Sequence, residues 1–221
     1  GSFLVEGVKM ARECQKSDLE IEKIFLTERV KEIEIFDEQK TVLVSDDVLR
    51  YLSDEKTPQG VVCRVKIPDR ALKEPSGRCL LLDGVSDPGN MGAIIRTANA
   101  AGYDEIYLTR DCTDPYAPKS VRASMSGIFF TKLYVAERKD ILACLKGVEI
   151  LVADMNGENI FTFEPPEKFA LAIGNEGNGI SEEVFKAASR TLRIPMQSTQ
   201  ESLNAAVAAG ISMYQLAKNS F

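Results

Sequence analysis

Short, nearly continuous hydrophobic runs recur along the second part of the chain, with helical patterns between them. The runs lie between residues 79 and 196 and read CLLLDGV, EIYLT, TKLYV, VEILVAD, FALAIG and TLRIPM. The segments that separate them are about ten residues long and have the apolar spacing of helices. Strands that are apolar on both faces are typical of parallel sheets covered by helices on both sides. The pattern therefore predicts an α/β fold with a mostly parallel sheet, whose ligands bind in loops at the carboxyl ends of the strands.

The first 66 residues show a smaller alternation of the same kind. Four β-type runs, FLVEG, EKIFLT, KTVLVS and GVVCRVKI, alternate with two helical patterns, VKMARECQ and SDDVLRYLSDE. Ser45 or Asp46 is the expected N-cap of the second helix. Prolines, a glycine and mixed charges then mark residues 67–78 as a linker. We therefore predict a small α/β domain over residues 1–66, that linker, and a larger α/β domain over residues 79–221.

Composition and charge limit which class of protein this can be and which chemistry it can perform. The chain of 221 residues is 44% hydrophobic, and no apolar run approaches the roughly 20 residues of a membrane span. Five scattered cysteines without paired spacing predict reduced thiols, a cytoplasmic location and no metal site. The absence of histidine removes the commonest general base. The formal net charge of −6 lowers the expectation of nucleic-acid binding, although an acidic protein can carry a local basic patch.

Three loops at predicted strand ends carry the residues that could take part in binding or catalysis. The first is LLLDGVSDPGNMGAIIRTANAAG, in which Pro88 and Gly89 predict a tight turn. A helix is expected to start near Asn90 and to end at Gly102, with Arg96 fewer than two turns inside it. Without further information, Asn90 is a capping residue and Arg96 a surface arginine.

The second loop, LAIGNEGNGIS, has the glycine content of a phosphate-binding loop but not its spacing. Its glycines run G-x-x-G-x-G, whereas a dinucleotide site needs G-x-G-x-x-G, and no segment has the Walker spacing. Glu176 in the middle of the loop also repels phosphate. Ser181 is explained as the N-cap of a helix that begins with two glutamates. The capping role of Ser181 does not explain why a glutamate stands at position 176.

The third loop, RIPMQSTQESLNAAVAAGISMYQLA, leads from a strand that ends at Pro195-Met196 into a helix of small residues. Ser198 and Glu201 have the spacing of a capping box, with Ser202 as a competing N-cap. Small residues are good helix formers, and so many of them in one helix also let another backbone approach closely.

Together, these three loops closely resemble the signature motifs of the SpoU-type ribose 2′-O-methyltransferases of the SPOUT superfamily. The matching segments are DPGNMGAIIRTANAAG, AIGNEGNGIS and IPMQSTQESLNAAVAAGI, in the same order, over residues 80–217. DPYAPKSVRASMSGIFF also resembles the family's connecting segment. FLVEG resembles the opening of the family's substrate-recognition domain, which is similar to a kink-turn-binding ribosomal protein. Other members have a basic stretch before that point, and Gly1-Ser2 looks like an expression remnant, so we expect truncation at the start.

The resemblance implies a trefoil knot at the C-terminal end of the parallel sheet, a homodimer through the knotted domain, and bent S-adenosylmethionine as cofactor. Since that cofactor carries a sulfonium and no phosphate, a glycine-rich loop with a carboxylate is compatible with it. The cofactor-binding positions implied by the resemblance are Ala172, Ile173, Gly174, Ile194, Met196 and Leu203. The polar positions implied to face the reaction centre are Asn90, Arg96, Glu176, Ser202 and Asn204.

The implied reaction is an in-line attack of an RNA ribose 2′-oxygen on the activated methyl group. Arg96 is the general base in one interpretation; in the other it grips an RNA phosphate, because a guanidinium is a donor and not an acceptor. Ribosomal RNA is the favoured substrate over transfer RNA, because the N-terminal module resembles that of the rRNA branch. Two other classes remain as hypotheses, a non-catalytic RNA-binding assembly factor of the same fold and a nucleotide-dependent oxidoreductase.

Overall fold

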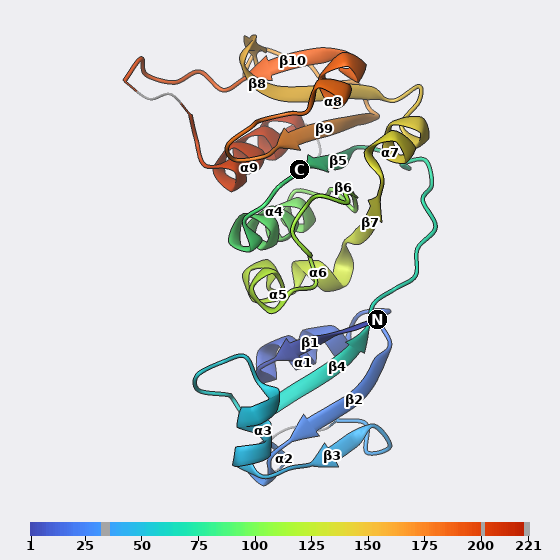
Figure 1. Ribbon diagram of the computed structural model, residues 1–221, viewed down its shortest axis with the longest axis vertical. Helices are drawn as coiled ribbons and strands as arrows, with labels where there is room; N and C mark the ends of the chain where they lie inside the picture. Colours follow the sequence, from blue (N-terminus) through green and yellow to red (C-terminus); the bar gives the residue numbers. More distant parts are fainter. Residues whose placement is uncertain (32–35, 200–201, 219–221) are drawn as a thin grey trace.

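The computed structural model describes residues 1–31, 36–199 and 202–218, and it contains two separate sheets. The N-terminal unit occupies one end of an elongated molecule, and the larger parallel sheet with its helices occupies the other (Figure 1). The two sheets fall within the two predicted domains, whose boundaries stay a prediction. Within the described ranges, no helix is both long enough and apolar enough to cross a bilayer.

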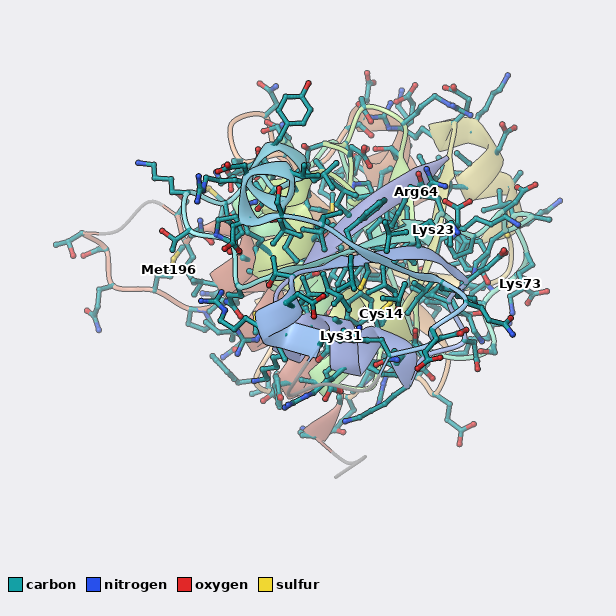
Figure 2. The ribbon with its side chains drawn as sticks, turned by 90° about the horizontal axis from the view of Figure 1, so that it is seen from below. Cys14, Lys23, Lys31, Arg64, Lys73 and Met196 are labelled. Carbon is teal, nitrogen blue, oxygen red and sulfur yellow. The ribbon has the colours of Figure 1, made fainter. Side chains whose placement is uncertain are left out.

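The N-terminal unit is a four-stranded sheet with the strand order β1-β4-β2-β3. Strand β4 pairs antiparallel with β1 and β2, and β3 pairs parallel with β2. Ser45 caps α3 by accepting a hydrogen bond from the backbone N–H of Val48 at 3.3 Å, as predicted. Lys23 and Arg64 are cross-strand neighbours on β2 and β4 and lie close together in the view from below (Figure 2). The elements are β1 (Ser2–Glu6), α1 (Val8–Gln15), β2 (Ile21–Leu26), α2 (Glu28–Lys31), β3 (Thr41–Leu43), α3 (Asp46–Leu52) and β4 (Val61–Lys66).

The predicted linker runs along the second sheet and is attached to it. The buried carboxylate of Glu105 accepts hydrogen bonds from the backbone N–H and the hydroxyl of Ser76, at 2.8 and 3.0 Å. Lys73 forms a 3.0 Å ion pair with the same carboxylate, and its carbonyl accepts from the Tyr107 hydroxyl at 2.9 Å. The linker is therefore a docked connector, which restricts how far the N-terminal unit can move.

The second sheet has six parallel strands in the order β10-β8-β9-β5-β6-β7. All six predicted strands form, and the parallel α/β sheet predicted for this part is confirmed. The strands are β5 (Cys79–Asp83), β6 (Glu105–Thr109), β7 (Lys132–Ala136), β8 (Glu149–Asn159), β9 (Phe169–Gly174) and β10 (Arg190–Arg193). The helices are α4 (Pro88–Ala100), α5 (Pro118–Ser124), α6 (Gly127–Phe130), α7 (Arg138–Cys144), α8 (Glu182–Ala187) and α9 (Ala205–Leu216).

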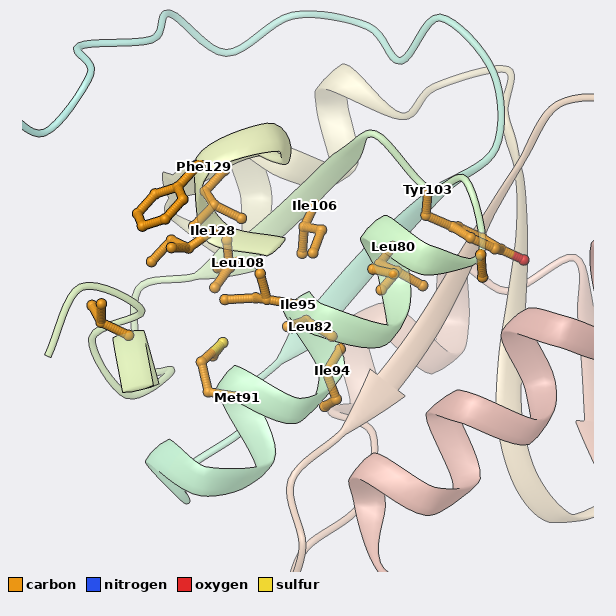
Figure 3. Close-up of a cluster of buried hydrophobic side chains, with 14 of the residues drawn as sticks. Leu80, Leu82, Met91, Ile94, Ile95, Tyr103, Ile106, Leu108, Ile128 and Phe129 are labelled. Atoms are coloured by element: carbon orange, nitrogen blue, oxygen red, sulfur yellow. The ribbon is translucent and has the colours of Figure 1, made fainter. Parts of the chain in front are cut away.

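Helices cover both faces of this sheet, which explains the continuous hydrophobic runs. Leu80 and Leu82 of β5 face one core, where Ile94 and Ile95 of α4 pack against them (Figure 3). Leu81, between them in the sequence, faces the other core. Full burial of each such side chain stabilises the fold by about 1.5–3 kcal/mol.

The ends of helix α4 differ partly from the prediction. The helix begins at Pro88, and Asp87 is its N-cap, because its side chain accepts from the backbone N–H of Asn90 at 2.8 Å. The expectation that the helix starts near Asn90 was therefore wrong by two residues, and the side chain of Asn90 is left for other contacts. Gly102 follows the helix with a φ of +72°, as predicted for a C-terminal glycine.

Register places the ends of two central strands side by side. Asp83, the last residue of β5, is the partner of Gly174, the last residue of β9. The first and second predicted loops therefore leave the sheet at neighbouring points of its carboxyl edge, where ligands of parallel sheets bind.

Candidate functional site

Glu176 accepts hydrogen bonds at both carboxylate oxygens. Its Oε2 accepts from the backbone N–H and the hydroxyl of Ser86, at 3.0 and 2.8 Å. Its Oε1 accepts from the backbone N–H of Asp87 at 3.2 Å and from the side-chain amide of Asn90 at 2.8 Å. These donors belong to the loop after β5 and the start of α4, whereas Glu176 follows β9. The carboxylate therefore joins the first predicted loop to the second.

The same hydrogen bonds determine the pKa of Glu176. Partial burial raises the pKa of this carboxyl group, but the bonds from Asn90 and Ser86 outweigh burial and lower the pKa to about 2. A carboxylate with so low a pKa is a weak proton acceptor. We therefore infer that Glu176 positions Asn90 and the adjoining loop and is not the general base.

Asn204 joins the third loop to the same network. Its side-chain amide donates to Oδ1 of Asn90 at 2.9 Å. Its own oxygen caps α9 by accepting from the backbone N–H groups of Ala206 and Val207, at 2.9 and 3.2 Å. The expectation that Ser202 caps this helix was therefore wrong, and the alternative capping box includes Glu201, which lies outside the described residues.

The glycine-rich loop folds back on itself through close backbone contacts. Asn175 and Gly179 exchange two backbone hydrogen bonds of 2.9 Å. A Cβ added at Gly174 would lie 2.3 Å from the carbonyl carbon of Gly179, so only glycine fits there. Gly179 itself has a φ of +69°. The side chain of Asn175 donates to the carbonyl of Gly84 at 2.8 Å and fixes the turn on the end of β5.

A cleft of about 650 Å³ opens beside this loop, between the middle of β8, the carboxyl end of β9 and the segment before α9. Its volume is in the range of small-molecule sites. The lining combines backbone of the glycine loop with apolar side chains, and its described residues include Asp154 and Glu176 but no lysine or arginine. Such a lining suits a cationic or neutral ligand and disfavours a polyphosphate.

Most residues implied by the resemblance lie at this cleft. Its lining includes five of the six implied cofactor positions and three of the five polar positions: Ile173, Gly174, Ile194, Met196 and Leu203, together with Glu176, Ser202 and Asn204. Ala172 is fully buried inside β9 and supports the cleft from behind. Asn90 reaches the site through Glu176 and Asn204. Their roles in binding and reaction stay predictions.

Arg96, unlike the other polar residues implied by the resemblance, lies apart from the cleft and its hydrogen-bond network. It lies six residues after Asn90 on α4, which places it about 9 Å further along the helix axis and about 120° around it. Its side chain lines a different, smaller groove beside α1 of the N-terminal unit. The chain itself therefore does not bring Arg96 into the network of Asn90, Glu176 and Asn204.

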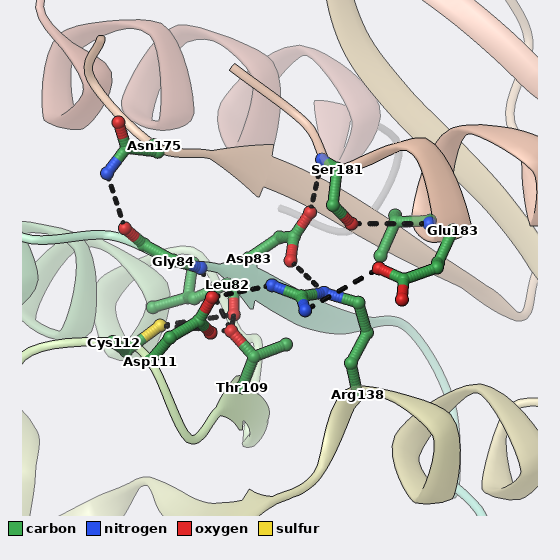
Figure 4. Close-up of polar contacts among 11 residues, drawn as sticks. Leu82, Asp83, Gly84, Thr109, Asp111, Cys112, Arg138, Asn175, Ser181 and Glu183 are labelled. Atoms are coloured by element: carbon green, nitrogen blue, oxygen red, sulfur yellow. Dashed lines mark hydrogen bonds and ion pairs between the residues drawn. The ribbon is translucent and has the colours of Figure 1, made fainter. Parts of the chain in front are cut away.

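Sequence analysis missed an ionic clamp under the glycine-rich loop (Figure 4). The carboxylate of Asp83 is 1% exposed and accepts from Nε of Arg138 and from the backbone N–H of Ser181, both at 2.7 Å. Arg138 also pairs with Asp111 at 2.7 Å and with Glu183 at 3.6 Å. Burial acts to lower the pKa of Arg138, but Asp83 and Asp111 outweigh it and raise this pKa above its usual value. The sequence signal that could have indicated this clamp was Asp83, an acidic residue at the end of an otherwise apolar strand.

The opposite wall of the cleft comes from an irregular part of β8, which the sequence did not reveal. Thr191 of β10 pairs with Val152, and the next residue pairs with Glu158, so the intervening stretch of β8 leaves the ladder. Asp154 in this stretch lines the cleft and accepts from the backbone N–H of Asn156 at 2.9 Å. Among the residues that the structure describes, no group of three metal-ligating side chains is close enough to hold a metal ion.

Comparison with known families agrees with this geometry. The model of the SpoU rRNA Methylase family matches residues 77–214, which contain the cleft, the first two loops and all but the last three residues of the third segment. The chain belongs to the SpoU rRNA methylase family. A second family model, the MRM3-like substrate binding domain, matches residues 1–63. The resemblance drawn from the three motifs is confirmed.

Known rRNA methyltransferases are similar to this chain over nearly its whole length. The 23S rRNA (guanosine(2553)-2′-O)-methyltransferase RlmP of Bacillus subtilis is 30% identical over 97% of this chain and 88% of its own length. The mitochondrial rRNA methyltransferase 3A of Danio rerio is 28% identical over 97% of this chain and 63% of its own length. An AdoMet-bound rRNA methyltransferase from Sinorhizobium meliloti superposes with a TM-score of 0.90 and 27% identity, covering 100% of this chain and 88% of that one.

Proposed function

We propose that this protein transfers a methyl group from S-adenosylmethionine to a ribose 2′-hydroxyl of RNA, with ribosomal RNA as the substrate. The observation that carries the proposal is the cleft lined by the second and third family motifs, to which the first is joined through Asn90, and which lacks cationic side chains among its described lining residues. Its family membership and its similarity to the B. subtilis 23S rRNA 2′-O-methyltransferase support the same activity.

The cleft's residues suit S-adenosylmethionine. The backbone of Gly174 to Gly179 supplies N–H and C=O groups, while Ile173, Ile194 and Leu203 supply apolar contacts for an adenine ring. When bound, the cofactor supplies a methyl group already activated by a sulfonium. The absence of lysine and arginine from the described lining is compatible with that positive charge, and the carboxylates of Asp154 and Glu176 favour it.

The chain's polar residues then have separate tasks. Glu176 holds Asn90, and Asn90 in turn holds Asn204, so one network fixes the first turns of α4 and α9 beside the cleft. Ser202, exposed at the cleft, offers a hydroxyl that can orient the incoming ribose. Because the methyl group is already activated, the protein's main task is alignment, which can lower a barrier by about 7–11 kcal/mol at best.

The proposal includes a homodimer, a trefoil knot in the C-terminal part of the second sheet, and a cytoplasmic location. A stripe on α9 supports the dimer: Val207 and Tyr214 lie two turns apart on one side of the helix and are 50% and 47% exposed. We expect a second copy to cover this stripe. Sedimentation of Val207→Glu should show a monomer where the wild type is a dimer, whereas Phe185→Glu on α8 should leave the dimer intact.

Two measurements, one of cofactor binding and one of methyl transfer, test the proposed activity. Calorimetry should show that the protein binds S-adenosylmethionine and not NAD. Methyl transfer from labelled cofactor to ribosomal RNA, with 2′-O-methyl mapping of the product, should identify one modified ribose. Binding of NAD alone would support the oxidoreductase hypothesis. Cofactor and RNA binding without transfer would support the assembly factor.

A further inference from the structure

Helix α5 lies on the side of the second unit that faces the N-terminal unit, where it packs against strand β1 (Figure 1). Arg122 of α5 donates from Nη1 to Oδ2 of Asp54 at 2.9 Å, and the same nitrogen lies 4.0 Å from Oε1 of Glu6. Glu6 ends β1 and Asp54 follows α3, so both carboxylates belong to the N-terminal unit. We call these three residues the interdomain cluster, because an arginine of one unit pairs in it with two carboxylates of the other.

Glu6 is the buried member of the interdomain cluster. Its side chain is 5% exposed, whereas those of Arg122 and Asp54 are 38% and 56% exposed. Its Oε2 accepts a hydrogen bond from the hydroxyl of Ser53, and its Oε1 accepts from the backbone N–H of Asp54 at 3.2 Å. These bonds attach the segment after α3 to the end of β1, so both carboxylates are in place to receive Arg122.

An aromatic contact lies beside the interdomain cluster and adds area to the same interface. Phe3 of β1 is 4% exposed and packs on Tyr116, which precedes α5, with the ring centroids 5.0 Å apart. Apolar contact is not directional, so the two rings by themselves leave the rotation of one unit on the other weakly defined. A hydrogen-bonded ion pair has a preferred geometry and defines that rotation.

Helix α5 connects the interdomain cluster to the candidate site. Gly92 of α4 packs on α5 so closely that an added Cβ would lie 2.4 Å from the carbonyl oxygen of Ser120. Lys119 of α5 pairs at 3.3 Å with Asp87, the N-cap of α4. Asn90 lies in the first turn of α4. The N-terminal unit is therefore attached, through one short helix, to the element that carries Asn90.

We propose that Arg122 is a positioning residue, which fixes the orientation of the N-terminal unit to the cofactor cleft and so determines which ribose of the RNA is methylated. The inference rests on the proposed function and on the match of the N-terminal unit to a substrate binding domain. Relative motion is the default for two units joined by a linker. RNA bound by one unit presents the same ribose to the other only if their rotation is restricted. A misplacement of about 1 Å costs about 100-fold in rate, so a small rotation is enough.

Charge reversal in the full-length chain tests the proposal, with 23S ribosomal RNA transcribed in vitro as the substrate. Arg122→Glu places a third carboxylate beside Glu6 and Asp54, and should lower methylation at the wild-type ribose by about 10- to 100-fold and add methyl groups at neighbouring riboses. In the double variant Arg122→Glu with Asp54→Arg, a cation again lies between two carboxylates and the net charge is restored, so rate and selectivity should recover. Lys186→Glu reverses an equal charge in a surface pair on α8 and should change neither.

Two further measurements separate positioning from a loss of folding. Calorimetry should give every variant the wild-type affinity for S-adenosylmethionine. Energy transfer between dyes on non-natural amino acids at positions 51 and 146 reports the arrangement of the units, because Tyr51 and Lys146 are exposed and each unit carries one of them. The distribution of transfer efficiencies should broaden in Arg122→Glu and narrow again in the double variant.

The proposal fails if Arg122→Glu methylates the wild-type ribose at the wild-type rate, or if its energy transfer is unchanged. A loss of rate that the double variant does not restore also overturns it, because the ionic contact is then not the cause. Wild-type protein that transfers no methyl group to the RNA refutes the proposed function, and this inference with it. Unchanged energy transfer in Arg122→Glu refutes the inference alone.

Discussion

The side-chain amide of Asn90 donates a 2.8 Å hydrogen bond to Oε1 of Glu176, across 86 positions of the sequence. This bond joins the start of α4 to the loop after β9, and Asn204 extends it to the start of α9 through a further 2.9 Å bond. Three loops that are distant in the chain therefore share one hydrogen-bond network, in which the Glu176 carboxylate accepts from the first loop and Asn90 accepts from the third.

Replacement of Glu176 by glutamine should disrupt this network while the fold remains. A glutamine NH₂ group faces at least one of the donors from Ser86, Asp87 or Asn90, so a donor opposes a donor. Misplacement of Asn90 and the loop should lower methyl transfer by up to about 100-fold. Single-turnover assays with saturating S-adenosylmethionine measure this. Glu182→Gln on α8, a surface-pair residue, is the control and should retain wild-type rates. A Glu176→Gln variant of wild-type rate would contradict the positioning role.

The low pKa of Glu176 predicts how its contribution to stability depends on pH. The pKa is about 2 in the folded protein and roughly 4.3 in an unfolded chain. The unfolded state therefore binds a proton first as the pH falls, and the stabilisation by this carboxylate is complete above about pH 4.3 and is lost down to about pH 2. The urea midpoints of wild type and Glu176→Gln should differ at pH 6 and converge near pH 2. A difference that is constant over this range would show that the carboxylate charge contributes nothing.

The hydrophobic pattern was sufficient to predict the sheet, because strands buried on both faces must be apolar throughout. All six strands of the second sheet and the glycine after α4 followed from such local rules. Asn90 could not be assigned correctly in this way. Asparagine is a common capping residue, but Asp87, three residues before Asn90, is the N-cap here because Pro88 suits the first helical turn.

The contacts of the candidate site depend on strand order, which local patterns do not contain. Asp83 and Ser181 meet only because β9 lies beside β5, and Arg138 reaches them from the end of β7. Motif resemblance supplied most of the cleft lining, but it grouped Arg96 with residues that line another surface. The 120° rotation along α4 separates them, and helical geometry alone was enough to reveal it.

Removal of the glycine at position 174 should close the cofactor site. The added Cβ of Gly174→Ala would lie 2.3–2.5 Å from backbone atoms of Gly179 and Ile180, which cannot move without opening the loop. We expect a loss of S-adenosylmethionine binding in calorimetry and a stability cost of about 1–3 kcal/mol. Gly177→Ala is a matched control in the same loop, because its Cβ meets only Oδ1 of Asn175 at an ordinary 3.6 Å. Equal cofactor affinity of the two variants would show that the loop contact is unimportant.

The clamp between Arg138 and Asp83 should matter more than any surface ion pair nearby. In Arg138→Met the 1% exposed carboxylate of Asp83 loses its cation, and breaking a buried pair in this way costs about 3–5 kcal/mol. Arg110→Met breaks a pair with Glu137 whose side chains are 66% and 55% exposed, and should cost less than about 1 kcal/mol. Urea unfolding gives both values. Because Asp83 also holds the N–H of Ser181, amide exchange at residues 174–181 should accelerate in Arg138→Met and not in Arg110→Met. Uniform acceleration over the whole sheet would indicate general destabilisation, and the assignment of Arg138 to loop positioning would then be wrong.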